Sequence, residues 1–286
     1  MGTYVVTGAA SGIGRASADR LRADGHRVIG VDLRDTDVTA DLSTDDGRRA
    51  AIDAVIAEAG VRLDGAVMAA GLGPAKGRER LIVDVNVLGV TELLDGLRPA
   101  LAASGNAKVV VLGSNSTTTT PMVPRRAVRR LVDGDLDGAV RQIRRRAGIS
   151  GPVAYAASKI AVTRWCRIRA VTDDWAGAGI RLNVLAPGPV LTPLLQAQLE
   201  SSTGSQVRSF PMPIREFGTP GQLAEWITML LSPAANSTVG SVIVVDGGTD
   251  ALIRPRDWPR SLPIRAVPRL LWAMYRAPRE GRVAQY

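Results

Sequence analysis

The chain is poor in the residues that build disulfides, metal sites and catalytic triads. Among its 286 residues it has one cysteine, Cys166, and one histidine, His26. A lone cysteine excludes an intrachain disulfide, and a lone histidine argues against a His/Cys metal site or a Ser-His-Asp triad. Because His26 stands in the turn-like stretch ADGHRV, we expect it to be a solvated loop residue, and we expect no bound metal.

Long apolar runs and a leader-like beginning are also missing. The sequence has no run of 18 apolar residues, which argues against a membrane-spanning helix. Residues 3–7 read directly as a strand, where a signal peptide would place a basic stretch and an apolar core. We therefore expect a cytoplasmic protein.

The net charge of +9 is concentrated in two segments. Residues 121–150 carry +5 and residues 254–286 carry +6, so the rest of the chain carries −2. Aromatic residues are interleaved with the arginines only in the C-terminal basic segment, and no nucleic-acid reading module is recognisable. We expect two basic elements appended to a nearly neutral body, and no nucleic-acid partner.

Short apolar runs alternate with longer segments that have helical spacing. Strands so uniformly apolar are covered on both faces, and their alternation with helices indicates βαβ units. The sequence therefore predicts an α/β fold, a single-domain Rossmann-type doubly wound sheet of seven parallel strands. We place strands at 3–7, 27–32, 37–42, 63–71, 108–114, 180–186 and 241–247, and helices at 12–24, 44–60 (capped by Thr44), 84–103 and 152–177.

Two segments fall outside this alternation. Residues 121–151 form a predicted helical insertion after the fifth strand, and residues 254–286 form a basic C-terminal extension. We therefore divide the chain into a dinucleotide-binding catalytic domain at 1–253, which includes the insertion, and the extension.

A glycine-rich stretch, TGAASGIG at residues 7–14, follows the first strand and opens the first helix. Gly8 permits a tight turn, Gly12 lets the backbone approach a pyrophosphate, and Gly14 allows close helix–strand packing. In this position the stretch predicts a dinucleotide-binding loop.

Asp32 ends the second predicted strand, where a carboxylate can accept both ribose hydroxyls of adenosine and would repel a 2′-phosphate. This favours NAD over NADP. The neighbouring Arg34 leaves an alternative, because an arginine there could bind the additional phosphate.

Lysine is scarce, with three residues in the chain, yet Lys159 follows Tyr155 by four positions in AYAASKI. On a helix these two side chains share a face. A free tyrosine has a pKa near 10, and an ammonium roughly 6 Å away at an effective dielectric of about 20 stabilises the phenolate by about 2.8 kcal/mol. We therefore predict a tyrosine whose pKa is lowered by about two units, poised for proton transfer.

The patterns T-G-x-x-x-G-x-G, Y-x-x-x-K and P-G-x-x-x-T resemble the classical short-chain dehydrogenase/reductases over about residues 3–250. The stretches GHRVIGVDLRDTDVTADLST, AAGLGP, APGPVLTPLLQAQL and DGGTDALIRP are similar to the bacterial 3α-hydroxysteroid dehydrogenase/carbonyl reductases and the related coniferyl-alcohol-type dehydrogenases. Those enzymes carry a helical insertion at the same place. The family motif N-A-G reads A-A-G here, because Ala69 replaces the asparagine, which weakens a hydrogen bond between central strands.

The resemblance implies a catalytic set of four residues. Ser114 orients the substrate oxygen, with Ser116 as its competitor, Tyr155 is the acid/base, and Lys159 tunes it. Asn86 holds a proton-relay water, or alternatively is a helix-interior asparagine bonded to its own backbone.

The resemblance also implies NAD as the cofactor, with NADP less favoured. Asp41 and Leu42 are expected at the adenine ring and Thr192 at the nicotinamide carboxamide. The implied cofactor-binding residues are Gly8, Ser11, Gly12, Ile13, Gly14, Asp32, Leu33, Asp41, Leu42, Ala70, Gly71, Tyr155, Lys159, Pro187, Gly188, Val190 and Thr192.

The predicted function is an NAD-dependent oxidoreductase that interconverts a secondary alcohol and a ketone on a bulky hydrophobic substrate. Residues 191–219, apolar around the polar stretch ESSTGSQ, are expected to fold over it. The subgroup resemblance favours a hydroxysteroid or a similar cyclic or aromatic alcohol. The alternatives are an aromatic-alcohol dehydrogenase, a general carbonyl reductase, and a catalytically silent NAD-binding regulator, against which the complete catalytic set argues.

Two partner predictions concern the basic segments. In the family the insertion serves subunit contact, so we expect a homodimer or homotetramer. The arginines of this insertion argue against an apolar dimer interface. The alternative is a solvated pair of helices. In the extension, apolar residues at 270–275 lie between arginines. This pattern favours either peripheral contact with anionic lipid or an arm packed across a neighbouring subunit.

Overall fold

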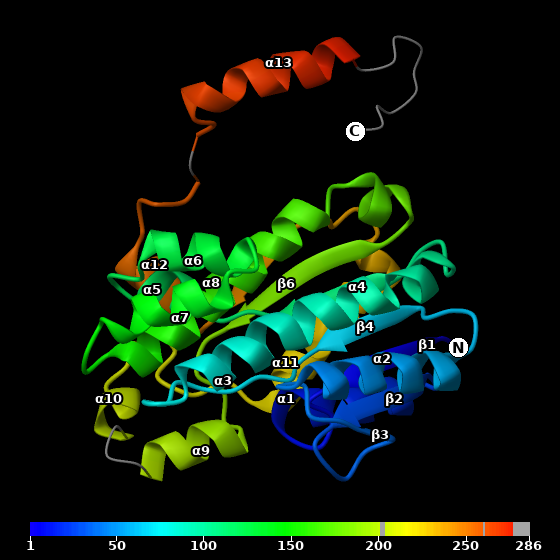
Figure 1. Ribbon diagram of the computed structural model, residues 1–286, viewed down its shortest axis with the longest axis horizontal. Coiled ribbons are helices and arrows are strands. Elements are labelled where there is room, and N and C mark those ends of the chain that lie inside the picture. Colours follow the sequence, from blue (N-terminus) through cyan, green and yellow to red (C-terminus); the bar gives the residue numbers. More distant parts are fainter. Residues whose placement is uncertain (201–203, 260, 277–286) are drawn as a thin grey trace.

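A computed structural model describes residues 1–200, 204–259 and 261–276. Its centre is a seven-stranded sheet of order β3-β2-β1-β4-β5-β6-β7 with every neighbouring pair parallel, as the sequence predicted (Figure 1). Chain order reverses between β1 and β4, so the carboxyl ends of these central strands border a topological switch point. The strands are β1 Thr3–Thr7, β2 Arg27–Asp32, β3 Val38–Thr39, β4 Gly65–Met68, β5 Lys108–Leu112, β6 Arg181–Pro187 and β7 Val242–Val245.

Helices cover both faces of the sheet, each with its own apolar core. On one face α1 (Gly12–Ala23) and α11 (Pro220–Leu231) pack over β1, β4, β5 and β6. On the other face lie α2 (Asp45–Ala59), α4 (Gly89–Ala102) and α8 (Ser150–Arg169). This three-layer arrangement explains why the strands are apolar throughout.

The beginning of α2 is capped as predicted, since Thr44 Oγ1 accepts a hydrogen bond from the Gly47 amide at 3.0 Å. The strand predicted at 37–42 is shorter, because after Thr39 the chain enters a turn in which the Asp41 carboxylate accepts the Ser43 amide at 2.9 Å. That turn leads directly into the α2 cap.

Two predicted helices are divided in the structure. The helix predicted at 84–103 consists of a π-helical turn, Asp84–Leu88, followed by α4, and is preceded by the short α3 (Glu79–Val83). The helix predicted at 152–177 ends at Arg169, and a separate π-helical turn occupies Asp173–Gly177. Thr172 interrupts it because its backbone is extended, with φ −90° and ψ 162°.

The insertion is helical, as predicted, and consists mainly of α6 (Arg125–Val132) and α7 (Leu136–Arg144) after the single turn α5 (Ser116–Thr119). The pair is not solvated all round. One face joins the core beside α8, with the buried side chains of Ala127, Val128, Leu131, Leu136, Ala139, Val140 and Ile143.

His26 is half-buried rather than solvated. Its Nδ1 accepts a hydrogen bond from the Gly2 amide at 3.1 Å, and its ring packs edge-on against Tyr4 at 4.9 Å between centroids. Because it precedes β2, it lies at the amino end of the sheet.

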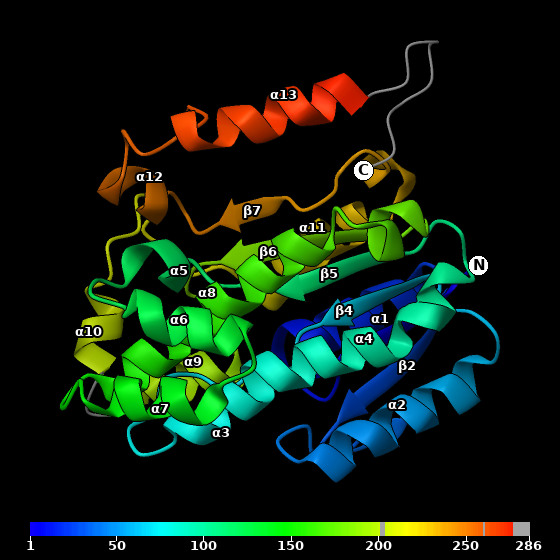
Figure 2. The same ribbon diagram turned by 45° about the horizontal axis from the view of Figure 1, so that its top comes forward.

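Beyond the sheet, α9 (Pro193–Glu200) and α10 (Gly204–Arg208) follow β6, a 3₁₀ turn (Pro233–Ala235) precedes β7, and α12 (Thr249–Ile253) follows it. The extension then forms a 3₁₀ turn, Ile264–Ala266, and α13, Val267–Arg276. Both views show α13 standing apart from the body (Figures 1 and 2). Residues 277–286 of the predicted extension, and 201–203 of the polar stretch ESSTGSQ, lie outside the described residues. Among the helices that are described, none is long and apolar enough to cross a bilayer.

Candidate active site

The glycine loop lies between β1 and α1 with the backbone that its glycines permit. Gly8 and Gly12 have φ values of +72° and +55°, a region that side chains with a Cβ rarely adopt. A Cβ on Gly14 would collide with the carbonyl oxygen of Gly8, so the start of α1 packs directly on the loop. The turn at Gly8 and the close packing at Gly14 agree with the sequence prediction.

The loop also contacts two other parts of the predicted site. A Cβ on Gly8 would lie 2.9 Å from the Ala70 amide nitrogen, and one on Gly12 would lie 3.2 Å from Thr192 Cγ2. Ser11 is the N-cap residue of α1, yet no side chain in the described part of the molecule caps this helix. The first amides of α1 therefore lack a side-chain acceptor, a feature suited to an anion.

Thr7 holds the backbone at Ala69 and Ala70. Its Oγ1, 62 residues away in sequence, accepts hydrogen bonds from the amides of Ala69 and Ala70, both at 3.1 Å. This places the loop after β4 beside the glycine loop, and the residue was missed from the sequence although it begins the TGAASGIG stretch.

Asp32 stands beside the glycine loop at the end of β2. Its Oδ2 accepts the Ala10 amide at 3.0 Å and its Oδ1 accepts the Leu33 amide at 2.7 Å. The Leu33 side chain is 62% exposed, and Arg34 has only Asp35 as a described ion-pair partner, at 3.9 Å. The carboxylate is thus the group fixed against the loop, whereas Arg34 extends into solvent.

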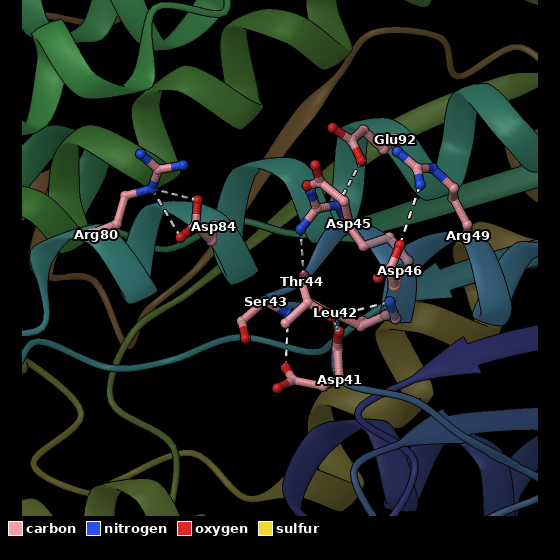
Figure 3. Close-up of polar contacts among 12 residues, drawn as sticks. Asp41, Leu42, Ser43, Thr44, Asp45, Asp46, Arg49, Arg80, Asp84 and Glu92 are labelled. Atoms are coloured by element: carbon pink, nitrogen blue, oxygen red, sulfur yellow. Dashed lines mark hydrogen bonds and ion pairs between the residues drawn. The ribbon is translucent and has the colours of Figure 1, made fainter.

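The turn at Asp41 and Leu42 is held by a buried arginine. Arg48 is 1% exposed, and its Nη1 donates to the Leu42 carbonyl oxygen at 3.1 Å. Its Nε donates to Glu92 Oε2 at 2.5 Å, and its Nη2 pairs with Asp45. Figure 3 shows these acidic partners around the turn. The bonds from Ser43 lower the pKa of the Asp41 carboxyl.

Ser114 and Tyr155 meet at the carboxyl end of β5. Ser114 is 6% exposed, and its hydroxyl is close enough to the phenol of Tyr155, which is half-buried, to lower the pKa of that phenol. Ser116 donates its amide to Ser114 Oγ at 3.1 Å, but its own hydroxyl is buried and has no hydrogen-bond partner among the described residues. Of the two candidate serines, Ser114 is therefore the one joined to Tyr155.

The predicted direction of the Tyr155 pKa is wrong for the chain by itself. Burial raises the pKa of the phenol, and the hydrogen bond from Ser114 opposes this only in part. Lys159 is 6% exposed, and burial lowers the pKa of its ammonium to about 8. Its Nζ donates to the Leu112 carbonyl oxygen at 2.8 Å. The sequence estimate counted the attraction between the two groups but not the cost of removing both from water.

Asn86 is fully buried. Its side chain forms hydrogen bonds with Leu72 and Ser158, which lie outside its own helical turn. Oδ1 accepts the Leu72 amide at 2.8 Å, while Nδ2 donates to the Leu72 carbonyl oxygen at 3.0 Å and to Ser158 Oγ at 3.1 Å. A Cβ on Gly71 would lie 3.1 Å from Asn86 Oδ1 and 3.5 Å from Lys159 Nζ. The π-helical turn, α8 and the loop after β4 therefore converge at Gly71.

The turn after β6 closes this end of the sheet. The Pro187 carbonyl oxygen accepts the Asn115 amide at 2.9 Å, and the Gly188 amide donates to Val245 at 3.0 Å. Asn115 also donates its side-chain amide to Asp246 at 3.3 Å. Asn115 and Asp246 were missed from the sequence, where nothing distinguishes them from ordinary loop residues.

Helix α9 lies over the loop that follows β4. A Cβ on Gly73 would lie 3.0 Å from Leu194 Cδ1 and 2.9 Å from Gln198 Nε2. Val190 is buried and forms a parallel bridge to Gly218, whereas Leu191 and Leu194 stay exposed. The segment after β6 therefore lies beside the loop after β4 and leaves the side chains of Leu191 and Leu194 exposed.

Comparison with known proteins agrees with this geometry. The family described as Enoyl-(Acyl carrier protein) reductase matches residues 8–250. A 3-alpha-hydroxysteroid dehydrogenase/carbonyl reductase of Comamonas testosteroni is 40% identical, over 89% of this chain and 99% of its own length. A coniferyl-alcohol dehydrogenase of Pseudomonas sp. strain HR199 is 29% identical, over 85% and 94%.

Among solved structures, the 3-alpha-hydroxysteroid dehydrogenase of Pseudomonas sp. B-0831 complexed with NADH is 42% identical. It superposes with a TM-score of 0.84 over 90% of this chain and all of its own. With its parallel sheet, glycine loop and paired Ser114 and Tyr155, the chain belongs to the short-chain dehydrogenase/reductase family and is an oxidoreductase of that family.

Proposed function

We propose that this enzyme uses NAD to interconvert a secondary alcohol and a ketone on a bulky hydrophobic substrate, a hydroxysteroid or a similar cyclic alcohol. The observation that carries the proposal is the neighbouring side chains of Ser114 and Tyr155, with Lys159 on the same helix as the tyrosine. Two hydroxyls at one strand end can bind one substrate oxygen and exchange a proton with it.

The residues around the glycine loop fit a dinucleotide. The uncapped amides of α1 suit its diphosphate, and Gly12 leaves space there that a side chain would fill. Asp32 suits the adenosine ribose and disfavours a 2′-phosphate, while Leu42 and Thr192 suit the adenine and the carboxamide. The NADH complex of the Pseudomonas relative supports the same choice. When bound, nicotinamide supplies or accepts the hydride.

Proton transfer is assigned to the side chains. In ketone reduction Tyr155 donates a proton to the substrate oxygen while Ser114 holds that oxygen by a hydrogen bond. In alcohol oxidation the phenolate accepts the proton, and the positive charge of Lys159 stabilises it. Asn86 acts as a positioning residue, because its side chain is occupied by Leu72 and Ser158.

The substrate class rests on the segment after β6 and on the relatives. Leu191 and Leu194 present apolar side chains near the loop after β4, which suits a hydrophobic ring system. The 3-alpha-hydroxysteroid dehydrogenases support a steroid, and the coniferyl-alcohol dehydrogenase supports an aromatic alcohol as the second candidate.

A substrate panel tests this proposal. The full chain is mixed with NADH and either a 3-ketosteroid, a cyclic ketone or an aromatic aldehyde, and NADH oxidation is followed. We expect kcat/KM for the steroid to exceed that for the aldehyde. The reverse order would favour the aromatic-alcohol alternative, and no turnover with any of them, despite NADH binding, would favour a silent regulator.

We infer that the C-terminal extension makes peripheral contact with anionic lipid. Leu270, Leu271, Trp272 and Met274 of α13 are exposed, and Arg269 falls on the opposite side of an ideal helix from Leu271 and Met274. Among the described elements α13 packs mainly on the turn before it.

Co-sedimentation with phosphatidylcholine vesicles, with and without phosphatidylglycerol, compares the full chain with one that ends at Ile253. We expect only the full chain to bind, and only to the anionic vesicles. Equal partitioning of both chains would overturn the lipid contact.

Light scattering tests the proposed homo-oligomer, for which we expect two or four times the chain mass of 30.2 kDa.

A further inference from the structure

The outer side of the α6–α7 pair contains a small cavity lined by arginines. Its volume is about 160 Å³, enough to hold several waters. The lining residues are Arg126 and Arg130 from α6, Arg141 and Arg145 from the end of α7, with Gly138 and Gln142 between them. The cavity therefore suits a small polar anion, and its charged lining does not suit a steroid.

Most of this positive charge is not balanced locally. Arg130 lies 3.5 Å from the Asp135 carboxylate. In the described ranges, no carboxylate forms an ion pair with Arg126, Arg141 or Arg145. The cavity therefore gathers four guanidinium groups against one carboxylate.

The fold holds these groups together although they repel. Arg126 and Arg130 are four residues apart on α6, as are Arg141 and Arg145 at the end of α7, and like charges at this spacing destabilise a helix. The opposite faces of both helices are buried in the core, so neither helix can rotate its arginines away.

A glycine makes room for one of the arginines. A Cβ on Gly138 would collide with Nη1 of Arg130 and with the carboxylate of Asp135. Asp135 is in turn fixed as the N-cap of α7, since its Oδ1 accepts the Gly138 amide at 2.9 Å. Gly138 therefore leaves space at the cavity for the guanidinium group of Arg130.

We propose that the α6–α7 cavity binds a diphosphate group carried by a small soluble molecule. Guanidinium groups form paired, charge-assisted hydrogen bonds with phosphate oxygens, and four of them can surround a compact, multiply charged anion. None of the lining residues belongs to the glycine loop or to the catalytic set, so the site is separate from the proposed cofactor site.

Calorimetric titration with inorganic pyrophosphate tests the proposal, in saturating NADH so that the glycine loop does not compete. Arg126→Gln/Arg141→Gln removes two lining charges, whereas Arg125→Gln/Arg129→Gln removes two charges from α6 outside the cavity. We expect saturable binding to the unmodified chain, at least about tenfold weaker in the first variant, and within about twofold of it in the second. No saturable binding, or equal weakening in both variants, would overturn the site.

Thermal melting gives an independent readout and reports folding. We expect pyrophosphate to raise the Tm of the unmodified chain and of Arg125→Gln/Arg129→Gln, but not that of Arg126→Gln/Arg141→Gln. If that double variant does not fold, Arg145→Gln takes its place, with the same expectation. An equal rise in all variants would contradict the proposal.

Vesicles separate a soluble ligand from a lipid head group. On phosphatidylcholine vesicles containing phosphatidic acid, we expect the two double variants to co-sediment equally. Loss of vesicle binding in Arg126→Gln/Arg141→Gln alone would overturn the soluble-ligand part of the proposal.

Discussion

The ammonium of Lys159 donates a hydrogen bond to the carbonyl oxygen of Leu112 at 2.8 Å, which joins the middle of α8 to the end of β5. This charge lies among buried groups, and burial lowers the pKa of Lys159 from 10.5 to about 8. The buried ammonium that stabilises the Tyr155 phenolate therefore also lowers the stability of the folded protein.

We predict that Lys159→Met is more stable than the unmodified protein at pH 7, by up to about 3 kcal/mol. Below pH 8 the lysine is protonated in both states and the full cost of burial is present. Between pH 8 and 10.5 the folded protein has lost the proton that the unfolded chain retains, so the stability of the unmodified protein rises with pH.

Urea unfolding at pH 7, 8, 9 and 10 measures this difference. Lys159→Met should lose its advantage progressively across that range, and it should also lose turnover. Lys76→Met, a change of the same type in the loop before α3, should leave stability unchanged at every pH. A less stable Lys159→Met at pH 7 would contradict the burial argument.

The hydrogen bond from Ser114 is predicted to set the pH profile of alcohol oxidation. Because this bond lowers the pKa of Tyr155, Ser114→Ala should raise that pKa further, and the rise of kcat/KM should move to higher pH. Ser116→Ala, which removes a hydroxyl that has no hydrogen-bond partner among the described residues, should leave the midpoint unchanged. A shift in Ser116→Ala instead would assign the role to the other serine.

Arg48 is predicted to position the adenine side of the cofactor site. Arg48→Met removes the donor to Leu42, and we expect a loss of about 2–3 kcal/mol of stability and a several-fold rise in KM for NADH. The kcat should stay within about twofold, since the reacting end is untouched.

The matched control is Arg49→Met, whose exposed pair with Asp46 at 3.2 Å appears in Figure 3 and should contribute less than about 1 kcal/mol. Steady-state kinetics and chemical unfolding of both variants give the comparison. A KM for NADH that is unchanged in Arg48→Met would remove the positioning role.

Asp32 is predicted to select NADH over NADPH by at least about 100-fold in kcat/KM. Two like charges about 4 Å apart at an effective dielectric of 20 repel by about 4 kcal/mol. Asp32→Asn should reduce the preference to about tenfold or less, while Asp35→Asn, an exposed carboxylate nearby, should leave it intact. Similar preferences in all three proteins would indicate that Arg34 or the backbone makes the choice.

The sequence predicted the sheet well because buried parallel strands are continuous apolar runs, and it predicted the glycine loop because its conformation depends on local glycines. The features it missed depend on contacts between distant residues. The π-helical turn accompanies a hydrogen bond that the Leu72 amide donates to Asn86 Oδ1. Arg48 can be buried because Glu92, 44 residues away, accepts a hydrogen bond from its Nε.

The candidate site shows the same division. The spacing of Tyr155 and Lys159 predicted a shared helix face, which the structure confirms, since both lie on α8. The direction of the Tyr155 pKa was missed because it depends on burial and on where the ammonium points, and neither can be read from spacing.

The most direct test of the account is the kcat of Tyr155→Phe, measured together with its dissociation constant for NADH. Loss of a positioned proton donor should lower kcat by about 10²–10⁴-fold, while NADH binding stays within about threefold because the phenyl ring preserves the packing. Turnover that persists at the original rate would contradict the assignment of Tyr155 as the acid/base.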